Sequence, residues 1–306
     1  MAVIGLGAMG AATLYQLAKH GVRAIGLDRF VPPHHHGSSH GETRITRQAI
    51  GEGADYVPLV LRSHAIWDEL EATTGARLIE RCGFLAIAAP GARAEMHGKT
   101  AFVDATIAAA RQHGIVHELP TAAEAARRFP QFVLRGDETC YFEPGGGYLH
   151  PETCIDVQLQ AAARLGATLQ FDSRVEAVVP DGAGVRIETS TGHVHAAHAI
   201  VAAGSWSGNF AGAALRRNLK VFRQLLHWLP VTAPQHFAAD AAPVFIWSYG
   251  TDAEDQFYGF PPLAGSGAMK CATETYHAAI HPDSDWQQVA IHEAGDFYAR
   301  HVAGRV

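Results

Sequence analysis

The chain has 306 residues, of which 48% are hydrophobic and 18% are charged, and its formal net charge is −6 at pH 7. This composition excludes a disordered chain, and the length allows two domains with sizeable cores. The negative charge disfavours nucleic acid and anionic membranes as partners, so we expect a small-molecule partner.

Residues 1–28 carry the pattern around which the chain is organised. A short apolar run enters a Gly-x-Gly-x-x-Gly motif, a helix is expected up to Gly21, and a second apolar run, 22–27, ends in Asp28. Strand, glycines, helix, strand and terminal acid in this order form the dinucleotide-binding fingerprint in its required context. The sequence therefore predicts that this unit binds an adenine dinucleotide.

Each glycine of the motif has an expected role. Gly5 makes the tight turn, Gly7 lets the backbone approach a pyrophosphate, and Gly10 lets the helix close on the strand. The phosphates would then lie at the N-terminus of the helix, where free N–H groups and the dipole favour anions. Asp28 is placed to accept hydrogen bonds from a ribose hydroxyl.

A loop rich in Pro, Gly and Ser at 32–44 separates this unit from the next predicted helix. Pro58 suits the first turn of that helix and Gly75 ends it. Its predicted apolar face consists of Leu59, Ile66 and Leu70.

The following section mixes strand and helix signals. Residues 83–89 are apolar and predict a buried strand, and 100–112 predict a helix that ends before Gly114. Thr121 and Glu124 have the spacing of a capping box, which predicts a short helix that stops before a proline.

From residue 143 onward a turn-rich crossing leads to a helix at 151–165 and then to short strands. The expected strands are 167–171, 175–179, 185–189, 193–197 and 200–203. The sequence Pro180-Asp181-Gly182 predicts a turn between two of them. Because this is an α/β pattern resuming after an insertion, the first domain is expected to consist of discontinuous segments.

The last section predicts mainly strands. They are expected within 221–231, 243–249, 256–263 and 268–276, and a helix is expected at 286–301. The fold class is therefore α/β in two domains, with a Rossmann-like domain and a second, mainly antiparallel sheet domain.

The cysteines, the histidines and the apolar runs indicate whether a metal site or a membrane span is to be expected. The cysteines are Cys82, Cys140, Cys154 and Cys271. They lack a Cys-x-x-Cys pair or a zinc-ligand spacing, so reduced thiols are expected. The run His34-His35-His36 lacks a second ligand group, so no metal is expected. No apolar run reaches the roughly 18 residues of a membrane span, and no signal peptide is recognisable, so a cytoplasmic protein is expected.

With these motifs in view, the chain resembles the monomeric sarcosine oxidase and N-methyltryptophan oxidase family of the D-amino-acid-oxidase superfamily. The resemblance is carried by GSSHGETRITR at 37–47, GEGADYVPLVLRS at 51–63, FEPGGGYLHPE at 142–152, AIVAAGSWS at 199–207, and YGFPP followed by Lys270. It covers essentially the whole chain. It implies FAD, a secondary amino acid as substrate, oxidation to an imine that water hydrolyses, release of hydrogen peroxide from O2, and a monomer.

The resemblance also implies roles for individual residues. Those expected at the cofactor are Gly5, Gly7, Gly10, Asp28, Gly37, Ser38, Ser39, Thr43, Arg44, Val175 and Gly204. Arg44 matches the position over the isoalloxazine ring, and His40 matches an active-site histidine. Arg47 matches the arginine that binds the substrate carboxylate, and Tyr258 matches a substrate-pocket tyrosine. Lys270 matches the lysine that faces flavin N5 through water and activates oxygen.

The residue types suit these roles. A fixed cation beside the flavin stabilises negative charge as it develops, which Lys270 would supply. The planar fork of Arg47 suits a two-point contact with a carboxylate. Without the resemblance, surface ion pairs for the arginines, a loop histidine, a surface lysine and a packed tyrosine would be the ordinary interpretations.

The resemblance predicts an FAD-binding domain from 1–80 and 144–216 and a substrate domain from 81–143 and 217–306. The chain departs from the family in two ways. Glu274 stands where these oxidases carry a histidine, so the substrate is open. The family's flavin-linking cysteine and the last part of its FAD domain lie beyond Val306, so we expect a C-terminally truncated chain whose flavin binding and activity are open.

Two alternatives from other classes remain. The start IGLGAMG also resembles NAD(P)-dependent β-hydroxyacid dehydrogenases, although Asp28 would repel a 2′-phosphate and the long helical domain of those enzymes is not recognisable. The other alternative is an inactive, truncated nucleotide-binding protein.

Overall fold

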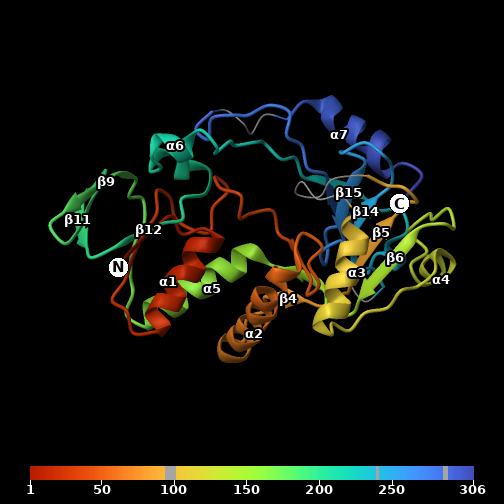
Figure 1. Ribbon diagram of the computed structural model, residues 1–306, viewed down its shortest axis with the longest axis horizontal. Coiled ribbons are helices and arrows are strands. Elements are labelled where there is room, and N and C mark those ends of the chain that lie inside the picture. Colours follow the sequence, from red (N-terminus) through yellow and green to blue (C-terminus); the bar gives the residue numbers. More distant parts are fainter. Residues whose placement is uncertain (94–100, 239–240, 285–288) are drawn as a thin grey trace.

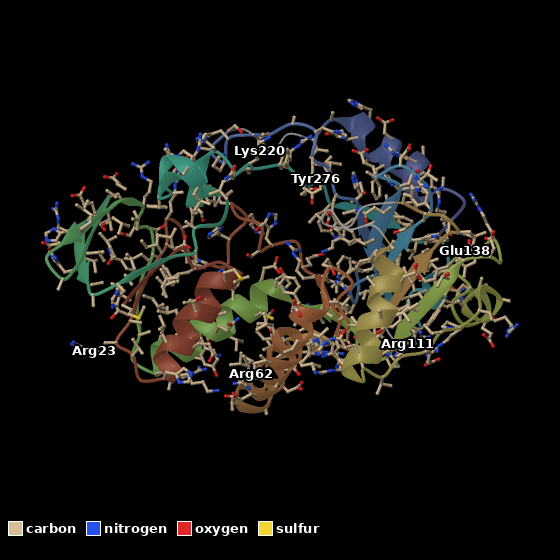
Figure 2. The ribbon with its side chains drawn as sticks, viewed as in Figure 1. Arg23, Arg62, Arg111, Glu138, Lys220 and Tyr276 are labelled. Atoms are coloured by element: carbon tan, nitrogen blue, oxygen red, sulfur yellow. The ribbon has the colours of Figure 1, made fainter. Side chains whose placement is uncertain are left out.

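The computed structural model describes residues 1–93, 101–238, 241–284 and 289–306. Two sheets lie towards opposite ends of the molecule, with a smaller sheet and the helix α2 between them (Figure 1). Charged side chains such as Arg62 and Arg111 lie on the outside (Figure 2).

The N-terminal sheet has four parallel strands. In spatial order they are β12 (Ala199–Val201), β1 (Ala2–Ile4), β2 (Ile25–Leu27) and β8 (Thr168–Gln170). The helices α1 (Ala8–Lys19) and α5 (Pro151–Arg164) pack together against it, with Leu14 and Leu159 in one core (Figure 1). The strands of this parallel sheet come from two separate segments of the chain. The sheet confirms the predicted Rossmann-like unit.

The helix α2 (Val57–Thr74) confirms a predicted helix and corrects its buried face. Pro58 lies in its first turn, and Gly75 ends it with a φ of 72°. Leu70 is buried, but Leu59 is 64% exposed, so its predicted core position was wrong. The buried face begins instead at Val57, and two residues along a helix turn the side chain roughly 200° around the axis.

A three-stranded sheet joins distant segments next to the first sheet. In spatial order its strands are β3 (Arg44–Thr46), β7 (Gly147–Leu149) and β4 (Ile79–Glu80), all antiparallel. A second three-stranded sheet consists of β11 (Gly192–Ala196), β10 (Gly184–Thr189) and β9 (Val175–Asp181). Strand β9 runs through Asp181, so the turn falls at 182–183, later than predicted.

The largest sheet has six strands. In spatial order they are β13 (His227–Pro230), β16 (Ala268–Ala272), β15 (Gln256–Phe260), β14 (Val244–Ser248), β5 (Phe84–Ala88) and β6 (Thr139–Glu143). Only the β14–β5 pair is parallel, so the sheet is mainly antiparallel, as predicted.

Alternating residues of β5 feed two different cores. Phe84 packs with α3 (Phe102–His113) on one face of the sheet, and Leu85 packs on the other face with α4 (Ala122–Arg128) and α7 (Ile291–Phe297). The predicted capping box of Thr121 and Glu124 opens α4. The shorter elements are α6 (Ala213–Arg216), the 3₁₀ turns at Ala54–Tyr56, Gly204–Asn209 and Pro234–His236, and a π-helical turn at Tyr298–Val302.

Two predicted elements are shorter in the structure. The strand expected at 221–231 is confined to β13, because Phe222 pairs instead with Ala279 through an isolated bridge outside the sheet. The final helix begins at Ile291, and the part of the prediction at 286–288 lies outside the described residues. The strands of the parallel sheet fall within 1–80 and 144–216, and those of the six-stranded sheet within 81–143 and 217–306. The domain boundaries themselves stay a prediction.

Candidate functional site

The turn after β1 requires glycine at two positions. Gly5 has a φ of +87°, and a Cβ there would lie 2.6 Å from the carbonyl oxygen of Ala202 in the segment after β12. A Cβ on Gly10 would lie 1.7 Å from the carbonyl oxygen of Gly5. Only glycine at these two positions lets α1 begin directly against the ends of β1 and β12.

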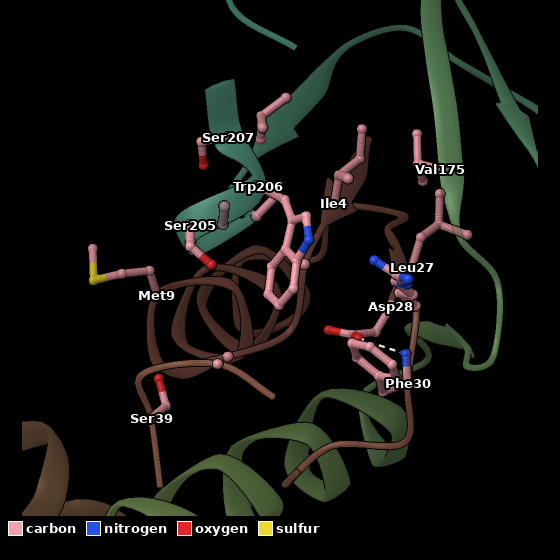
Figure 3. A pocket seen from close by; sticks show the side chains of 18 of the residues that line it. Ile4, Met9, Leu27, Asp28, Phe30, Ser39, Val175, Ser205, Trp206 and Ser207 are labelled. Atoms are coloured by element: carbon pink, nitrogen blue, oxygen red, sulfur yellow. Dashed lines mark hydrogen bonds between the residues drawn. The ribbon is translucent and has the colours of Figure 1, made fainter. Parts of the chain in front are cut away.

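A cavity of about 1020 Å³, here called the first cavity, opens in front of the N-terminus of α1 (Figure 3). Nine of the predicted cofactor residues line it, namely Gly5, Gly7, Asp28, Gly37, Ser38, Ser39, Arg44, Val175 and Gly204. The first turn of α1 contains no acidic residue. An N-terminus of this kind suits an anion such as a pyrophosphate.

Asp28 is held in a fixed orientation on the wall of the first cavity. It is 6% exposed, and its Oδ2 accepts a hydrogen bond from the Leu6 N–H at 2.6 Å. Its Oδ1 accepts one from the Phe30 N–H at 2.9 Å (Figure 3). Since each carboxylate oxygen can accept more than one hydrogen bond, Asp28 retains capacity for a ribose hydroxyl.

A second cavity of about 690 Å³ adjoins the first. Gly37, Ser38, Arg44 and Ser205 line both cavities. The remaining predicted active-site residues all line the second cavity, namely His40, Thr43, Arg47, Tyr258 and Lys270. Gly10 alone among the predicted cofactor residues lines neither cavity, since it packs beneath Gly5.

Lys270 projects from β16 into the loop before β3. It is 4% exposed, and its Nζ donates to the carbonyl oxygens of Gly41 at 2.6 Å and Thr43 at 2.8 Å. The Nζ also lies 4.3 Å from the centre of the Phe260 ring. Burial, and then the positive charge of Arg44, lower the pKa of Lys270 to about 7. The two carbonyls favour the protonated form, so this cation is held at a defined point.

Arg44 lies beside Lys270 and shares an acceptor with it. Its guanidinium donates to the carbonyl oxygens of Thr43 at 2.7 Å, His40 at 2.6 Å and Ser38. The Thr43 carbonyl thus accepts from both cations, while the buried Thr43 hydroxyl has no hydrogen-bond partner within the described residues. Burial lowers the pKa of Arg44. Two positive side chains therefore meet at the border between the cavities.

His40 and Tyr258 are neutral groups in the second cavity. Burial, followed by the charges of nearby residues, lowers the pKa of the His40 imidazole. Burial raises the pKa of the Tyr258 phenol, although Arg44 opposes this. Both side chains can donate or accept hydrogen bonds near neutral pH.

Arg47 is paired within the protein. Its Nη2 donates to both carboxylate oxygens of Glu52, at 2.5 and 2.6 Å, and its guanidinium lies over the rings of Phe84 and Phe102. The sequence interpretation did not single out Glu52, which also lines the second cavity. A substrate carboxylate at Arg47 would therefore meet a carboxylate already present.

Three further residues at the site were missed from the sequence: Glu152, Trp228 and Phe260. Glu152 accepts hydrogen bonds from the N–H groups of Gly41 and Glu42, at 2.6 and 3.1 Å. An acidic residue in the first turn of a helix is ordinary, so its sequence signal did not point to a loop more than a hundred residues away. The indole N–H of Trp228 donates to Glu42 at 2.9 Å.

Comparison with known proteins matches residues 1–302 to the family of FAD-dependent oxidoreductases designated DAO. The chain belongs to this family. The described geometry fits the cofactor, since the glycine turn, the N-terminus of α1, Asp28 and the buried Thr43 hydroxyl border two connected cavities. The match to this family rules out the alternative of an NAD-dependent β-hydroxyacid dehydrogenase.

Monomeric sarcosine oxidases and an N-methyl-L-tryptophan oxidase resemble the chain over most of its length. A monomeric sarcosine oxidase from Streptomyces avermitilis is 33% identical over 305 residues, which cover 95% of this chain and 75% of the relative. A monomeric sarcosine oxidase from a Bacillus species is 35% identical, with coverages of 92% and 70%. An N-methyl-L-tryptophan oxidase from Yersinia pestis is 33% identical, with coverages of 75% and 56%.

Solved structures confirm the fold. The open form of NikD, an amino acid oxidase, superposes with a TM-score of 0.76 over 100% of this chain and 78% of its own, at 23% identity. Glycine oxidase from Geobacillus kaustophilus gives a TM-score of 0.64 at 20% identity, covering 90% of this chain and 72% of its own. Within the described ranges of this chain, no helix combines the length and apolar character of a membrane span.

Proposed function

We propose that this FAD-dependent oxidoreductase is an oxidase of a secondary, N-methylated amino acid such as sarcosine or N-methyltryptophan. The observation that carries the proposal is the border between the two cavities. Arg44 lines both of them, Lys270 lines the second, and the two cations share the Thr43 carbonyl. The names of the relatives support the substrate class.

FAD would be held along the first cavity by the glycine turn, Asp28 and the 37–44 loop, and it supplies the acceptor for a hydride and the route of electrons to O2. In its protonated form, which prevails below the Lys270 pKa of about 7, Lys270 provides a positive charge where negative charge develops during oxygen reduction. Arg44 adds a second cation, anchored by three backbone carbonyls. The burial of both side chains strengthens their electrostatic effect.

The substrate would bind in the second cavity. Arg47 would contact its carboxylate, which requires the substrate to share or replace the contact that Arg47 makes with Glu52. Tyr258 and the neutral His40 offer hydrogen bonds to the amine side. Glu274 also lines this cavity and adds a carboxylate to its wall, so it bears on which amine is accepted.

Covalent attachment of FAD, a monomeric state and a cytoplasmic location complete the proposal. The linking cysteine is expected beyond residue 306. The four cysteines present are free, and burial raises the thiol pKa of each of them, which disfavours the reactive thiolate. None of them lines either cavity.

The decisive experiment measures visible flavin absorbance and peroxide release from the purified chain with sarcosine, N-methyltryptophan and glycine, with FAD added. The same assay is run on a longer version that continues beyond residue 306. Flavin binding with peroxide release on N-methylated substrates is expected. Flavin binding without peroxide release in either version would favour the alternative of an inactive nucleotide-binding protein. Tight NADH binding without flavin binding would refute FAD as the cofactor.

A further inference from the structure

The loop that binds the Lys270 ammonium is itself held by a residue of a distant helix. Glu152 lies in the first turn of α5. One of its carboxylate oxygens, Oε1, accepts hydrogen bonds from the N–H groups of Gly41 and Glu42. Gly41 also offers its carbonyl to Lys270. One residue of the loop therefore connects the carboxylate of Glu152 to the ammonium of Lys270.

The loop has an unusual backbone at this point. Gly41 has a φ of +100° and Glu42, a non-glycine residue, has a φ of +70°. The N–H groups of these two successive residues point towards one oxygen atom, and converging backbone N–H groups of this kind make an anion site. For a residue with a side chain this conformation is unfavourable and persists only when the surroundings hold it. The carboxylate of Glu152 fills the anion site, and the Trp228 indole anchors the Glu42 side chain.

We propose that Glu152 is a positioning residue for the oxidase reaction. It holds residues 41 and 42 in their positive-φ conformation, so that the carbonyl oxygens of Gly41 and Thr43 bind the Lys270 ammonium. The inference rests on the proposed function for its catalytic meaning. The hydrogen bonds that carry it, from Glu152 to the loop and from Lys270 to the loop, are independent of that function.

Charge gives Glu152 a second effect on the same cation. The charged groups that act on Lys270 are Arg44 from β3, Glu152 from α5 and Glu42 from the loop, and the titratable thiol of its neighbour Cys271 also lies close. Arg44 opposes the protonated form, whereas Glu152, the next largest influence among these groups, and Glu42 favour it. Removing the negative charge of Glu152 while leaving the hydrogen bonds should therefore weaken proton binding at Lys270.

The test measures the Lys270 pKa directly, by NMR titration of protein labelled at lysine ¹³Cε, with FAD added and the resonance assigned through Lys270→Met. Glu152→Gln keeps an acceptor oxygen and loses the charge, so the pKa should fall by about one unit, a tenfold change in proton affinity. Glu152→Asp keeps the charge but withdraws it by one methylene and should give a smaller fall. Asp156→Asn, one helical turn further along α5 and bonded to Gln160, is the matched control and should change nothing.

A second readout is the pH profile of flavin reoxidation by O2, which should lose rate at a lower pH in Glu152→Gln than in the wild type. An unchanged Lys270 pKa in both Glu152 variants, or an equal fall in Asp156→Asn, would overturn the proposal. The NMR titration needs no turnover, so a chain without oxidase activity would refute the proposed function while the assignment of Glu152 would still be decided.

Discussion

Lys270 is an ammonium inside the protein, held by two carbonyls and an aromatic ring. A lysine in an apolar strand context would normally reach solvent at its tip. Here the tip reaches the loop before β3, where it lies next to Arg44 and forms a cluster of two cations with it. Replacing it therefore tests charge at one point of the site.

Lys270→Met in a chain that binds flavin should slow reoxidation by O2 by about a hundredfold, the size of effect seen when one preorganised electrostatic group is lost. Reduction of the flavin by substrate should change far less, because the role proposed for Lys270 lies in the reduction of oxygen. Stopped-flow measurement of the two half-reactions separates these outcomes. Equal slowing of both would show that Lys270 has another role.

The same residue should leave a mark on stability. The pKa of Lys270 falls from 10.5 to about 7 on folding, so between these values the unfolded chain binds a proton that the folded chain has released. The free energy of unfolding should therefore rise with pH above about 7, with a slope approaching about 1.4 kcal/mol per pH unit from this group. Urea unfolding at several pH values compares the wild type with Lys270→Met. Parallel pH dependences in the two proteins would contradict the lowered pKa.

Arg47 should affect substrate binding more than chemistry. Arg47→Ala should raise KM roughly 10- to 100-fold, the loss expected for a charged hydrogen bond, with little change in kcat, because a carboxylate is bound equally in ground and transition states. Arg62→Ala, exposed on α2, is the control. Steady-state kinetics on an N-methylated amino acid provides the measurement, and a large fall in kcat at unchanged KM would argue against this role.

At the scale of elements, α1 packs tightly against the turn after β1. The two strands β1 and β12 and the helix meet within the reach of a single methyl group. This contact places the N-terminus of α1 at the first cavity. The glycine motif therefore lies among the residues expected to bind the cofactor.

Gly10→Ala should therefore displace α1, since its new Cβ would lie 1.7 Å from a backbone oxygen that cannot move aside alone. We expect a loss of stability of about 1–3 kcal/mol, typical of overpacking, together with weakened flavin binding. Gly295→Ala in α7, where a Cβ meets nothing within 4 Å, serves as the control. Thermal unfolding and flavin titration check both effects. A Gly10→Ala protein that binds flavin like the wild type would remove the structural role of this contact.

At the scale of the whole molecule, the site lies between the parallel sheet and the six-stranded sheet, and each sheet contributes to one of its two cavities. The first cavity takes its walls from the parallel sheet, and the second takes Tyr258, Phe260 and Lys270 from the six-stranded sheet. The 37–44 loop joins them, since Gly37, Ser38 and Arg44 line both. Under the proposed function, this arrangement would let the cofactor and the substrate meet while separate elements hold each.

The sequence by itself determined the local features of this protein. The spacing of Gly5, Gly7 and Gly10 predicted the turn and the helix, Gly75 predicted a helix end, and Thr121 with Glu124 predicted a capping box. These features depend on φ angles and hydrogen bonds within a few residues, so neighbouring residues suffice to specify them. The family resemblance added the candidate residues of the second cavity.

Only the tertiary structure decided which distant groups meet. Leu59 had the spacing of a buried residue yet faces solvent, because the packing partner of α2 selects another side of the helix. The pairing of Arg47 with Glu52 and the bond from Glu152 to the 41–42 loop depend on side-chain directions that spacing does not encode. The charge state of Lys270 likewise follows from burial and from Arg44, and both arise only when strands far apart in sequence come together.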